Sequence, residues 1–217
     1  MSQPAFVFDL DDTLYKERDY VASCFAFVGA AMAGRGHEGV AARLHALFAE
    51  GRADPIADAC APLGFTPEEV RALVLEMRGH FPDIALRPDA AALLGALRER
   101  GLAYSIVTNG RGETQRRKIG ALGLGDAASV SISGETGHAK PDPRAYEAAA
   151  AAHEGCRLVY VGDNPQKDFL APNAMGWTTV MLRCDGSHIH AQAAVPEEAA
   201  PAMTIGRLTE LLPLLES

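Results

Sequence analysis

The chain has 217 residues, of which 48% are hydrophobic and 22% charged, as in an ordinary folded domain. This composition excludes a disordered or collagen-like chain. Acidic residues outnumber basic ones by 28 to 20, so the formal net charge is −8 and provides no basic surface for a nucleic-acid polymer. A small phosphorylated ligand remains compatible with this charge, because a few local cations and amides hold such a ligand.

Neither the cysteines nor the N-terminal residues indicate export. The four cysteines include no C-x-x-C pair, which argues against a disulfide framework or a zinc ribbon. The first residues lack the charged and long apolar regions of a signal peptide, and no later apolar run approaches the ~20 residues that span a bilayer. We therefore expect a cytoplasmic protein with reduced thiols and no membrane partner.

The chain opens with a short apolar strand at residues 5–8, and residues 15–87 then show helical periodicity without a convincing strand. Helices are predicted at 21–32, 40–49 and 68–78. The last of these begins well, because Thr66 and Glu69 have the spacing of a capping box. We expect residues 15–87 to form a helical domain inserted after the first strand.

From residue 88 onward, predicted helices and strands alternate. The strands are expected at 103–107, 130–132, 158–161 and 178–182, with an edge strand at 204–205. The helices are expected at 88–100, 112–122, 143–153, 165–175 and 208–215. This alternation predicts an α/β fold, with residues 1–14 and 88–217 forming a doubly wound, Rossmann-like parallel sheet covered by helices on both faces.

Polar side chains follow several of the predicted strands. Because ligands bind outside the carboxyl ends of parallel strands, this edge is where a site is expected. Asp9 and Asp11 follow the first strand, and two carboxylates in one pocket repel each other unless a cation neutralises them or one is protonated. Mg²⁺ suits such hard oxygen ligands best. The remaining polar residues at the same edge are Thr108, Asn109, Lys140, Asp163 and Asp168.

Each of these features has an ordinary structural interpretation when taken alone. A D-x-D sequence after a strand is more often a turn or a helix cap, and Thr108-Asn109-Gly110 makes a good turn. Lys140 alone would usually be a solvated loop cation. The functional interpretation is favoured because four separate strand ends carry groups that suit phosphoryl transfer.

These segments resemble the four ordered motifs of the haloacid dehalogenase superfamily. The matching segments are Phe8 to Leu14, Thr108 to Gly110, Lys140 to Pro143 and Val161 to Asp168. The helical insertion between the first two motifs is similar to that superfamily's type I cap. The resemblance implies a phosphoric monoester hydrolase with Asp9 as the nucleophile, which forms an aspartyl-phosphate, and with Asp11 as the general acid and base.

The same resemblance implies roles for the remaining motif residues. The family's Mg²⁺ is held by the carboxylate of Asp9, the backbone carbonyl of Asp11 and the acid Asp163. Asp168 would complete the acidic motif through water or by positioning Lys140. Thr108, helped by the Asn109 amide, would bind the phosphoryl oxygens, and Lys140 would neutralise both the phosphate and Asp9.

Other activities remain open at this stage. Asp11 favours phosphoester chemistry over dehalogenation, because true dehalogenases of the family lack an acid at that position. A phosphonatase would use a cap lysine, and only Lys16 lies near the cap. A phosphomutase with the same core is an alternative, as is a receiver-like signalling domain, although its acceptor aspartate follows the third strand. A catalytically idle scaffold is a further alternative that no motif supports.

The substrate and the oligomeric state do not follow from the sequence. We expect a small phosphorylated metabolite, such as a nucleotide, a sugar phosphate or a phosphoglycolate-like compound. Arg18 is the cap-proximal residue that we expect to contact it. A metal site at Cys184, His188 and His190 is a weaker possibility, because no fourth ligand is evident.

Overall fold

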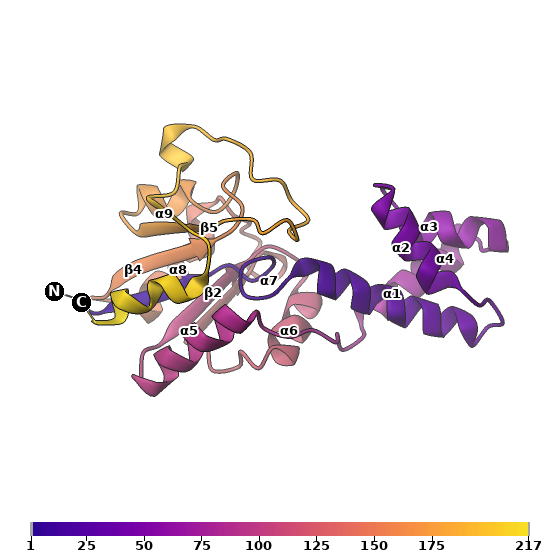
Figure 1. Cartoon of the computed structure of the whole chain (residues 1–217), viewed down its shortest axis with the longest axis horizontal. Coiled ribbons are helices and arrows are strands. Elements are labelled where there is room, and N and C mark those ends of the chain that lie inside the picture. Colours follow the sequence, from indigo (N-terminus) through magenta and orange to yellow (C-terminus); the bar gives the residue numbers. More distant parts are fainter. Residues whose placement is uncertain (1, 217) are drawn as a thin grey trace. The chain divides into compact units, whose positions relative to one another are not determined.

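A computed structural model describes residues 2–216 of the chain (Figure 1). The described chain forms two compact units. One consists of Asp19–Ile84, and the other takes in the chain through Arg18 and again from Ala85 onward. The predicted helical domain, residues 15–87, begins and ends a few residues outside the first of these units. Residues 1 and 217 of the predicted α/β core lie outside the described residues.

The α/β unit is built on one six-stranded sheet in which every neighbouring pair is parallel. The strand order is β3-β2-β1-β4-β5-β6, which confirms the predicted doubly wound α/β fold. The strands are β1 (Pro4–Phe8), β2 (Tyr104–Thr108), β3 (Ser129–Ile132), β4 (Arg157–Gly162), β5 (Thr178–Leu182) and β6 (Met203–Ile205).

Helices of this unit lie between successive strands. The α-helices are α5 (Pro88–Glu99), α6 (Gly112–Ala121), α7 (Ser133–Thr136), α8 (Glu147–Ala152) and α9 (Leu170–Ala174). Shorter or tighter turns are η2 (Pro143–Tyr146), η3 (Glu197–Ala199) and η4 (Leu208–Glu216). Helix α5 packs with η4 (Figure 1), and the contacts of α8 are with β2 and β3.

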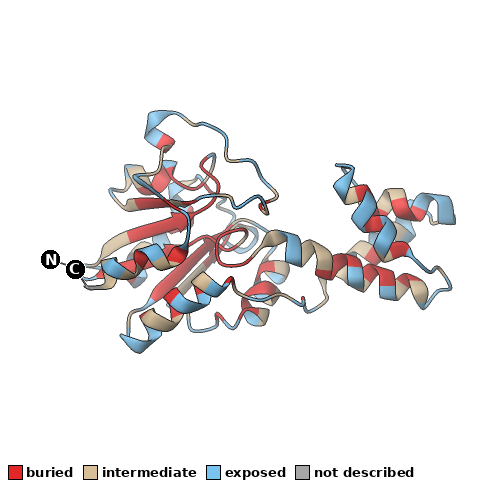
Figure 2. Cartoon of the chain, in the orientation of Figure 1, coloured by how far each residue is buried: buried red, intermediate tan, exposed pale blue. Residues whose placement is uncertain are grey.

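The central strands are buried along their length because both faces of the sheet are covered (Figure 2). Val7, Val107 and Tyr160 contribute to a core cluster on one face, which also contains Tyr146 and Phe169. Alternate residues of a strand point to opposite faces, so the apolar runs of these strands supply both cores.

The end of the chain differs from the prediction. Residues 208–215 were expected to form an α-helix, and they form the tighter 3₁₀ helix η4 instead. Pro213 lies inside this segment, and proline has no N–H to donate to a helical hydrogen bond.

The segment predicted as a helix at 165–175 is also shorter than expected, because α9 begins only at Leu170. Asn164 and Asp168 form local hydrogen bonds that hold the preceding residues in a turn. The Asn164 side chain accepts from the backbone N–H of Gln166, and the Asp168 side chain accepts from that of Asn164. Such side-chain bonds compete with helix formation.

The helical unit begins within α1 (Glu17–Ala33). Its further helices are α2 (Val40–Ala49), α3 (Pro55–Cys60), η1 (Ala61–Leu63) and α4 (Pro67–Arg78). Its apolar core includes Val28, Met32, Leu44 and Leu73. Thr66 and Glu69 form the predicted capping box at the start of α4. Helix α3 was not predicted, although Asp54 caps it and Pro55 begins it.

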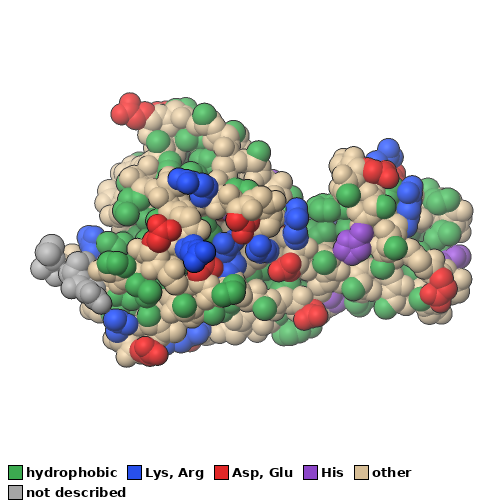
Figure 3. Space-filling view, viewed as in Figure 1, with side chains coloured by type: hydrophobic (Ala, Val, Ile, Leu, Met, Phe, Trp, Pro, Cys, Tyr) green, Lys and Arg blue, Asp and Glu red, His purple; other side chains and the backbone are tan. Residues whose placement is uncertain are grey.

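The surface of the chain carries both signs of charge, and Lys and Arg side chains lie among Asp and Glu on the face seen in Figure 3. Several form ion pairs, including Arg98 with Asp126 and Lys16 with Asp185. Among residues 2–216, no helix is both long and apolar enough to cross a membrane. A cytoplasmic location stays a prediction.

Candidate active site

The predicted site residues meet at the carboxyl edge of the sheet. Asp9 follows β1, Thr108 ends β2 and Asp163 follows β4. The backbone N–H of Asp9 continues the pairing of β1 with β4 by donating to the carbonyl of Val161, at 2.9 Å. The parallel register therefore places the Asp9 and Asp163 loops side by side, as the strand pattern predicts.

Lys140 lies at the centre of this edge and bridges two carboxylates. Its Nζ donates to Asp9 Oδ1 at 2.5 Å and to Asp168 Oδ1 at 2.6 Å. A third bond, 3.1 Å long, joins Nζ to the hydroxyl of Tyr160. The lysine and both acids are buried, so their charges are little screened by water.

Both oxygens of Asp168 accept hydrogen bonds from protein partners. Its Oδ1 accepts from Lys140 and from the Tyr160 hydroxyl, and its Oδ2 accepts from the backbone N–H of Asn164 at 2.8 Å. Gly162 allows this approach, since a Cβ at that position would lie 2.6 Å from Asp168 Oδ2. Asp168 is thus one of the residues that bond Lys140 Nζ, with Asp9 and Tyr160.

The residues present suit a divalent cation. One oxygen each from Asp9, Asp163 and Asp168 lies within 4.8 Å of the others, and all three residues are buried. Hard oxygen donors are what Mg²⁺ prefers. Three buried carboxylates share a single ammonium group, so the cluster carries excess negative charge that a divalent ion would balance.

The pKa values of this cluster reflect the same imbalance. Burial raises the pKa of Asp9, and repulsion from Asp168 and Asp163 adds to it against the attraction of Lys140. Burial likewise raises the pKa of Asp163. For Lys140 burial acts in the opposite direction, but Asp168 and Asp9 outweigh it and raise the pKa, so the ammonium form persists.

Asp11 lies in a different set of contacts. Lys118 Nζ donates to its Oδ1 at 2.6 Å and Gln115 Nε2 donates to its Oδ2 at 2.8 Å. The hydroxyl of Tyr15 also donates to Oδ1. Burial alone would raise the pKa of Asp11, but the Lys118 charge and these three hydrogen bonds outweigh it and lower the pKa.

Thr108 and Asn109 each make a hydrogen bond within the site, Thr108 to the glutamine that also bonds Asp11 and Asn109 to Lys140. The Thr108 hydroxyl accepts from Gln115 Nε2 at 2.7 Å. The Asn109 side chain clamps the backbone of Lys140, accepting from its N–H at 2.8 Å and donating to its carbonyl at 3.2 Å. The Asn109 side chain thus fixes the lysine loop.

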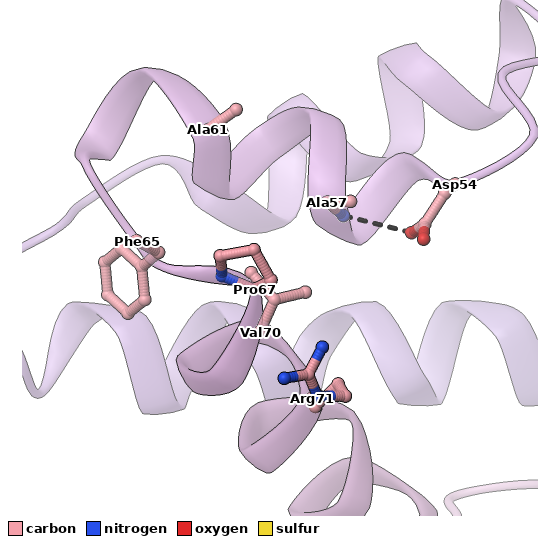
Figure 4. Close-up of a pocket in the computed structure, with 7 residues that line it drawn as sticks. All are labelled: Asp54, Ala57, Ala61, Phe65, Pro67, Val70 and Arg71. Carbon is pink, nitrogen blue, oxygen red and sulfur yellow. Dashed lines mark hydrogen bonds between the residues drawn. The ribbon is translucent and has the colours of Figure 1, made fainter.

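Arg18 is exposed, and it follows the loop that carries Asp9 and Asp11. The helical unit has a pocket of about 350 Å³ between α3 and α4 (Figure 4). Its two charged residues are engaged elsewhere, since Asp54 caps α3 and Arg71 pairs with Glu68. This pocket therefore holds no group poised for catalysis.

Sequence reasoning missed several residues of the site. Gln115 and Lys118 lie three apart on α6, on the helix face that reaches Asp11, and Lys118 is one of only four lysines. Tyr160 lies between the apolar residues Val159 and Val161 of β4, so its hydroxyl had no visible partner in the sequence. His188 was considered with Cys184 and His190, but the structure groups it with Asp12 and Asp163.

Comparison with known proteins identifies the family. The model of the haloacid dehalogenase-like hydrolases matches residues 4–176. The chain belongs to this family. Its sheet order and the four loops at the carboxyl edge therefore belong to a haloacid dehalogenase-like fold, which confirms the resemblance read from the motifs.

Curated relatives within the family include several phosphatases. A phosphoserine phosphatase of Thermus thermophilus is 36% identical over 156 residues, or 68% of this chain and 58% of the relative. A phosphoglycolate phosphatase of Rhodospirillum rubrum is 29% identical over 199 residues, covering 82% and 78%. An (S)-2-haloacid dehalogenase of a Pseudomonas species is 37% identical over 105 residues, covering 47% and 46%. The chain spans 58% and 59% of the length of the first two relatives matched.

Solved structures share the fold at lower identity. The HAD-family protein YfnB of Bacillus subtilis, solved with magnesium, matches with a TM-score of 0.68 and 17% identity over all of both chains. The L-2-haloacid dehalogenase RSc1362 matches with a TM-score of 0.63 and 22% identity, again over all of both chains. At these identities the likeness establishes the fold alone.

Proposed function

We propose that the chain is a magnesium-dependent phosphatase that hydrolyses a small phosphomonoester through an aspartyl-phosphate on Asp9. The observation that carries this proposal is the Lys140 bridge, which holds Asp9 and Asp168 beside Asp163 in one buried cluster. Phosphatases among the relatives support the reaction class.

Asp9 is the proposed nucleophile. Its carboxylate attacks phosphorus while the bond from phosphorus to the substrate oxygen breaks, and the phosphoryl group passes to Asp9. Lys140, 2.5 Å from Asp9 Oδ1, orients the carboxylate and offers positive charge to the phosphoryl oxygens. Thr108 accepts from Gln115 Nε2, which leaves the hydrogen of its hydroxyl free to donate to a phosphoryl oxygen.

Asp11 is the proposed general acid and base. It would give a proton to the leaving oxygen and then take one from the water that attacks the aspartyl-phosphate. In the structure it is held as an anion by Lys118, Gln115 and Tyr15, so the first of these steps requires that it gain a proton. These three residues are therefore proposed to control when Asp11 acts.

Mg²⁺ would be held by the carboxylates of Asp9 and Asp163 and by the backbone carbonyl of Asp11. When bound, it supplies charge that offsets the repulsion between the Asp9 carboxylate and the phosphate. Asp168 is proposed to position Lys140, because its Oδ1 accepts from Lys140 Nζ at 2.6 Å.

The proposed substrate is a small phosphorylated metabolite. The relatives named for phosphoserine, phosphoglycolate, ribulose 1,5-bisphosphate and glyceraldehyde 3-phosphate support that class, since each of these substrates is a small phosphate ester. Asp11 favours phosphate esters over haloacids for this chain. Arg18 is exposed and remains the proposed contact residue of the cap-proximal segment.

Turnover of p-nitrophenyl phosphate with and without Mg²⁺ tests the proposal, alongside the variant Asp9→Asn. We expect hydrolysis that chelation abolishes and a loss of about 10⁴-fold or more in Asp9→Asn. Asp126→Asn is the matched control, because Asp126 pairs with Arg98 and Tyr104 at the amino end of β2, away from the site. Magnesium-independent turnover, or an active Asp9→Asn, contradicts the proposal.

A parallel assay with 2-chloropropionate separates phosphatase from dehalogenase activity. Release of chloride without any phosphatase activity would replace the proposal with dehalogenation. A panel of nucleotides, sugar phosphates, phosphoserine and phosphoglycolate then identifies the preferred ester by its kcat/KM.

A further inference from the structure

The loop that follows β5 brings a histidine to two carboxylates beside the candidate active site. Asp12, Asp163 and His188 each offer one ligand atom, and these atoms lie within 4.8 Å of one another. All three residues are buried. Asp163 also belongs to the acidic cluster around Asp9, so the two groups of ligands share one residue.

The imidazole of His188 lacks a good protein partner. Its side chain is 0% exposed, and neither ring nitrogen forms a hydrogen bond of acceptable geometry with any residue among 2–216. The nearest acid is Asp163, whose Oδ2 lies 3.4 Å from Nδ1. Burying an unsatisfied polar group is costly, and native proteins commonly offset that cost with a ligand, an ion or water.

The positions of the three residues are fixed by their neighbours. Asp12 Oδ2 accepts from the backbone N–H of Ile189 at 2.8 Å, directly after His188. Its Oδ1 accepts from the backbone N–H of Glu17 at 2.8 Å. Farther along the loop, Gln192 donates to the carbonyls of Asp163 and Leu182, both at 2.7 Å. The loop therefore holds His188 against the carboxylates.

Asp12 itself has an unusual backbone. Its φ of 54° lies in the left-handed region, which a residue other than glycine adopts at some cost. This conformation accompanies the two bonds that its carboxylate makes to Glu17 and Ile189. Each carboxylate oxygen has a second lone pair, so Asp12 can still ligate an ion while accepting these bonds.

We propose that Asp12, Asp163 and His188 bind a second divalent cation, of the class that accepts imidazole nitrogen, such as Zn²⁺ or Co²⁺. The donor set decides the class, because one nitrogen and two carboxylate oxygens suit these metals and Mg²⁺ prefers oxygen alone. Ligand atoms around such an ion lie at most ~4 Å apart, so the observed spread requires only a small contraction.

The structure separates this site from the one considered on sequence grounds. Cys184 Sγ accepts from the backbone N–H of Gly186 at 3.3 Å, and His190 lies 3.9 Å from Glu17. Within residues 2–216, neither joins His188 in a group of ligand atoms. Of the C-x3-H-x-H pattern, only His188 belongs to the proposed site. Asp12 and Asp163 take the places of Cys184 and His190 as ligands.

Cobalt binding to the metal-free full chain tests the proposal without reference to activity. Mg²⁺ is first added at saturation to occupy the oxygen-only site, and Co²⁺ is then titrated while visible absorption and bound metal are measured. We expect one Co²⁺ per chain, and X-ray absorption of that sample should show one imidazole ligand and no sulfur. This measurement uses the unaltered protein, so it does not depend on whether a variant folds.

Variants then assign the histidine. His188→Asn should weaken Co²⁺ binding by at least ~100-fold, since loss of even an outer partner of a metal ligand costs 10–100-fold. His190→Asn and Cys184→Ser are matched controls from the same loop and should bind as the unaltered chain does. Failure to bind Co²⁺ beside Mg²⁺, an oxygen-only or sulfur-containing ligand set, or normal binding by His188→Asn overturns the proposal.

Discussion

Asp9 and Asp11 are two residues apart, yet their surroundings act in opposite directions. Asp9 lies among other acids with one shared lysine, and its pKa is raised. Asp11 has Lys118, Gln115 and Tyr15 as donors, and its pKa is lowered. The comparison shows that a single short loop can place one carboxylate beside a lysine that it shares with another acid, and a second carboxylate, two residues on, beside a lysine and two further donors.

The two lysines make the difference between these surroundings. Lys140 pairs with both Asp9 and Asp168, whereas Lys118 forms an ion pair with Asp11. Both are buried, with 4% of each residue exposed, so neither pair resembles a weak surface ion pair. Removing each lysine in turn is therefore the sharpest way to test the contrast.

Lys140→Met should have the largest effect. We expect kcat to fall about 10³-fold, because an aligned charge beside the transferring phosphoryl group is lost. The free energy of unfolding should also fall by ~3 kcal/mol at neutral pH, since two buried acids lose their partner. Enzyme assays and urea unfolding measure the two effects.

The pH dependence of that loss has a definite sign. Burial already raises the pKa of Asp9 above the ~3.9 of an unfolded chain, and loss of the attraction of Lys140 raises it further, so the folded variant binds more protons than the unfolded chain does. The variant should therefore be most stable at acidic pH and lose stability as pH rises. Unfolding curves at several pH values check this, and a variant whose stability rises with pH would refute it.

Asp11→Asn should have the next largest effect, about 10²-fold in kcat, because general acid–base catalysis is lost. The loss should differ between the two chemical steps. p-Nitrophenolate leaves without a proton, so a rapid burst of it should persist, followed by slow turnover. Stopped-flow absorbance measures both phases, and loss of the burst would place Asp11 in nucleophilic attack instead.

Lys118→Met should have a smaller effect on rate, less than about 10-fold near neutral pH, and a clear effect on its pH dependence. Lys118 lowers the pKa of Asp11, so its removal raises that pKa and keeps Asp11 protonated to higher pH. With an alkyl phosphate as substrate, the rate at which Asp9 is phosphorylated falls as pH rises and Asp11 loses its proton. In the variant this fall should begin at a higher pH than in the unaltered chain. An unchanged profile would show that Lys118 does not act through Asp11.

Tyr160→Phe should have the smallest effect. Its hydroxyl donates to Asp168 Oδ1 at 3.0 Å and accepts from Lys140 Nζ, and loss of these bonds should cost ~1 kcal/mol and a few-fold in kcat. Tyr104→Phe is the matched control, since its hydroxyl donates to Asp126 Oδ1 at 2.6 Å, away from the site. Equal losses of activity in both variants would contradict a specific role for the Tyr160 hydroxyl.

The sequence predicted the sheet well because buried strands carry an apolar signal of their own. Residues 178–182, for example, were predicted as a strand and form β5 with those same bounds. The shortened α9 and the 3₁₀ form of η4 could not be read from apolar periodicity, because the Asn164 and Asp168 side chains compete locally and Pro213 interrupts the hydrogen bonds.

The site was predictable at the residues that follow strands and obscure elsewhere. Lys140 and Asp163 lie in loops whose sequences match known motifs. Gln115 and Lys118 look like ordinary helix residues in the sequence, and only the folded structure shows that they contact Asp11 from α6. His188 was visible as a possible ligand, but its partners Asp12 and Asp163 lie far from it in sequence. Contacts of this range depend on the folded topology.

Chemical trapping of the intermediate tests the central claim, that Asp9 receives the phosphoryl group, most directly. The enzyme is mixed with a preferred phosphate ester and Mg²⁺, quenched during turnover and reduced with borohydride, which converts an aspartyl-phosphate to homoserine. Peptide mass spectrometry should find homoserine at Asp9 only when substrate is present. Homoserine at Asp11 or Asp163, or none at all while turnover proceeds, would contradict the account.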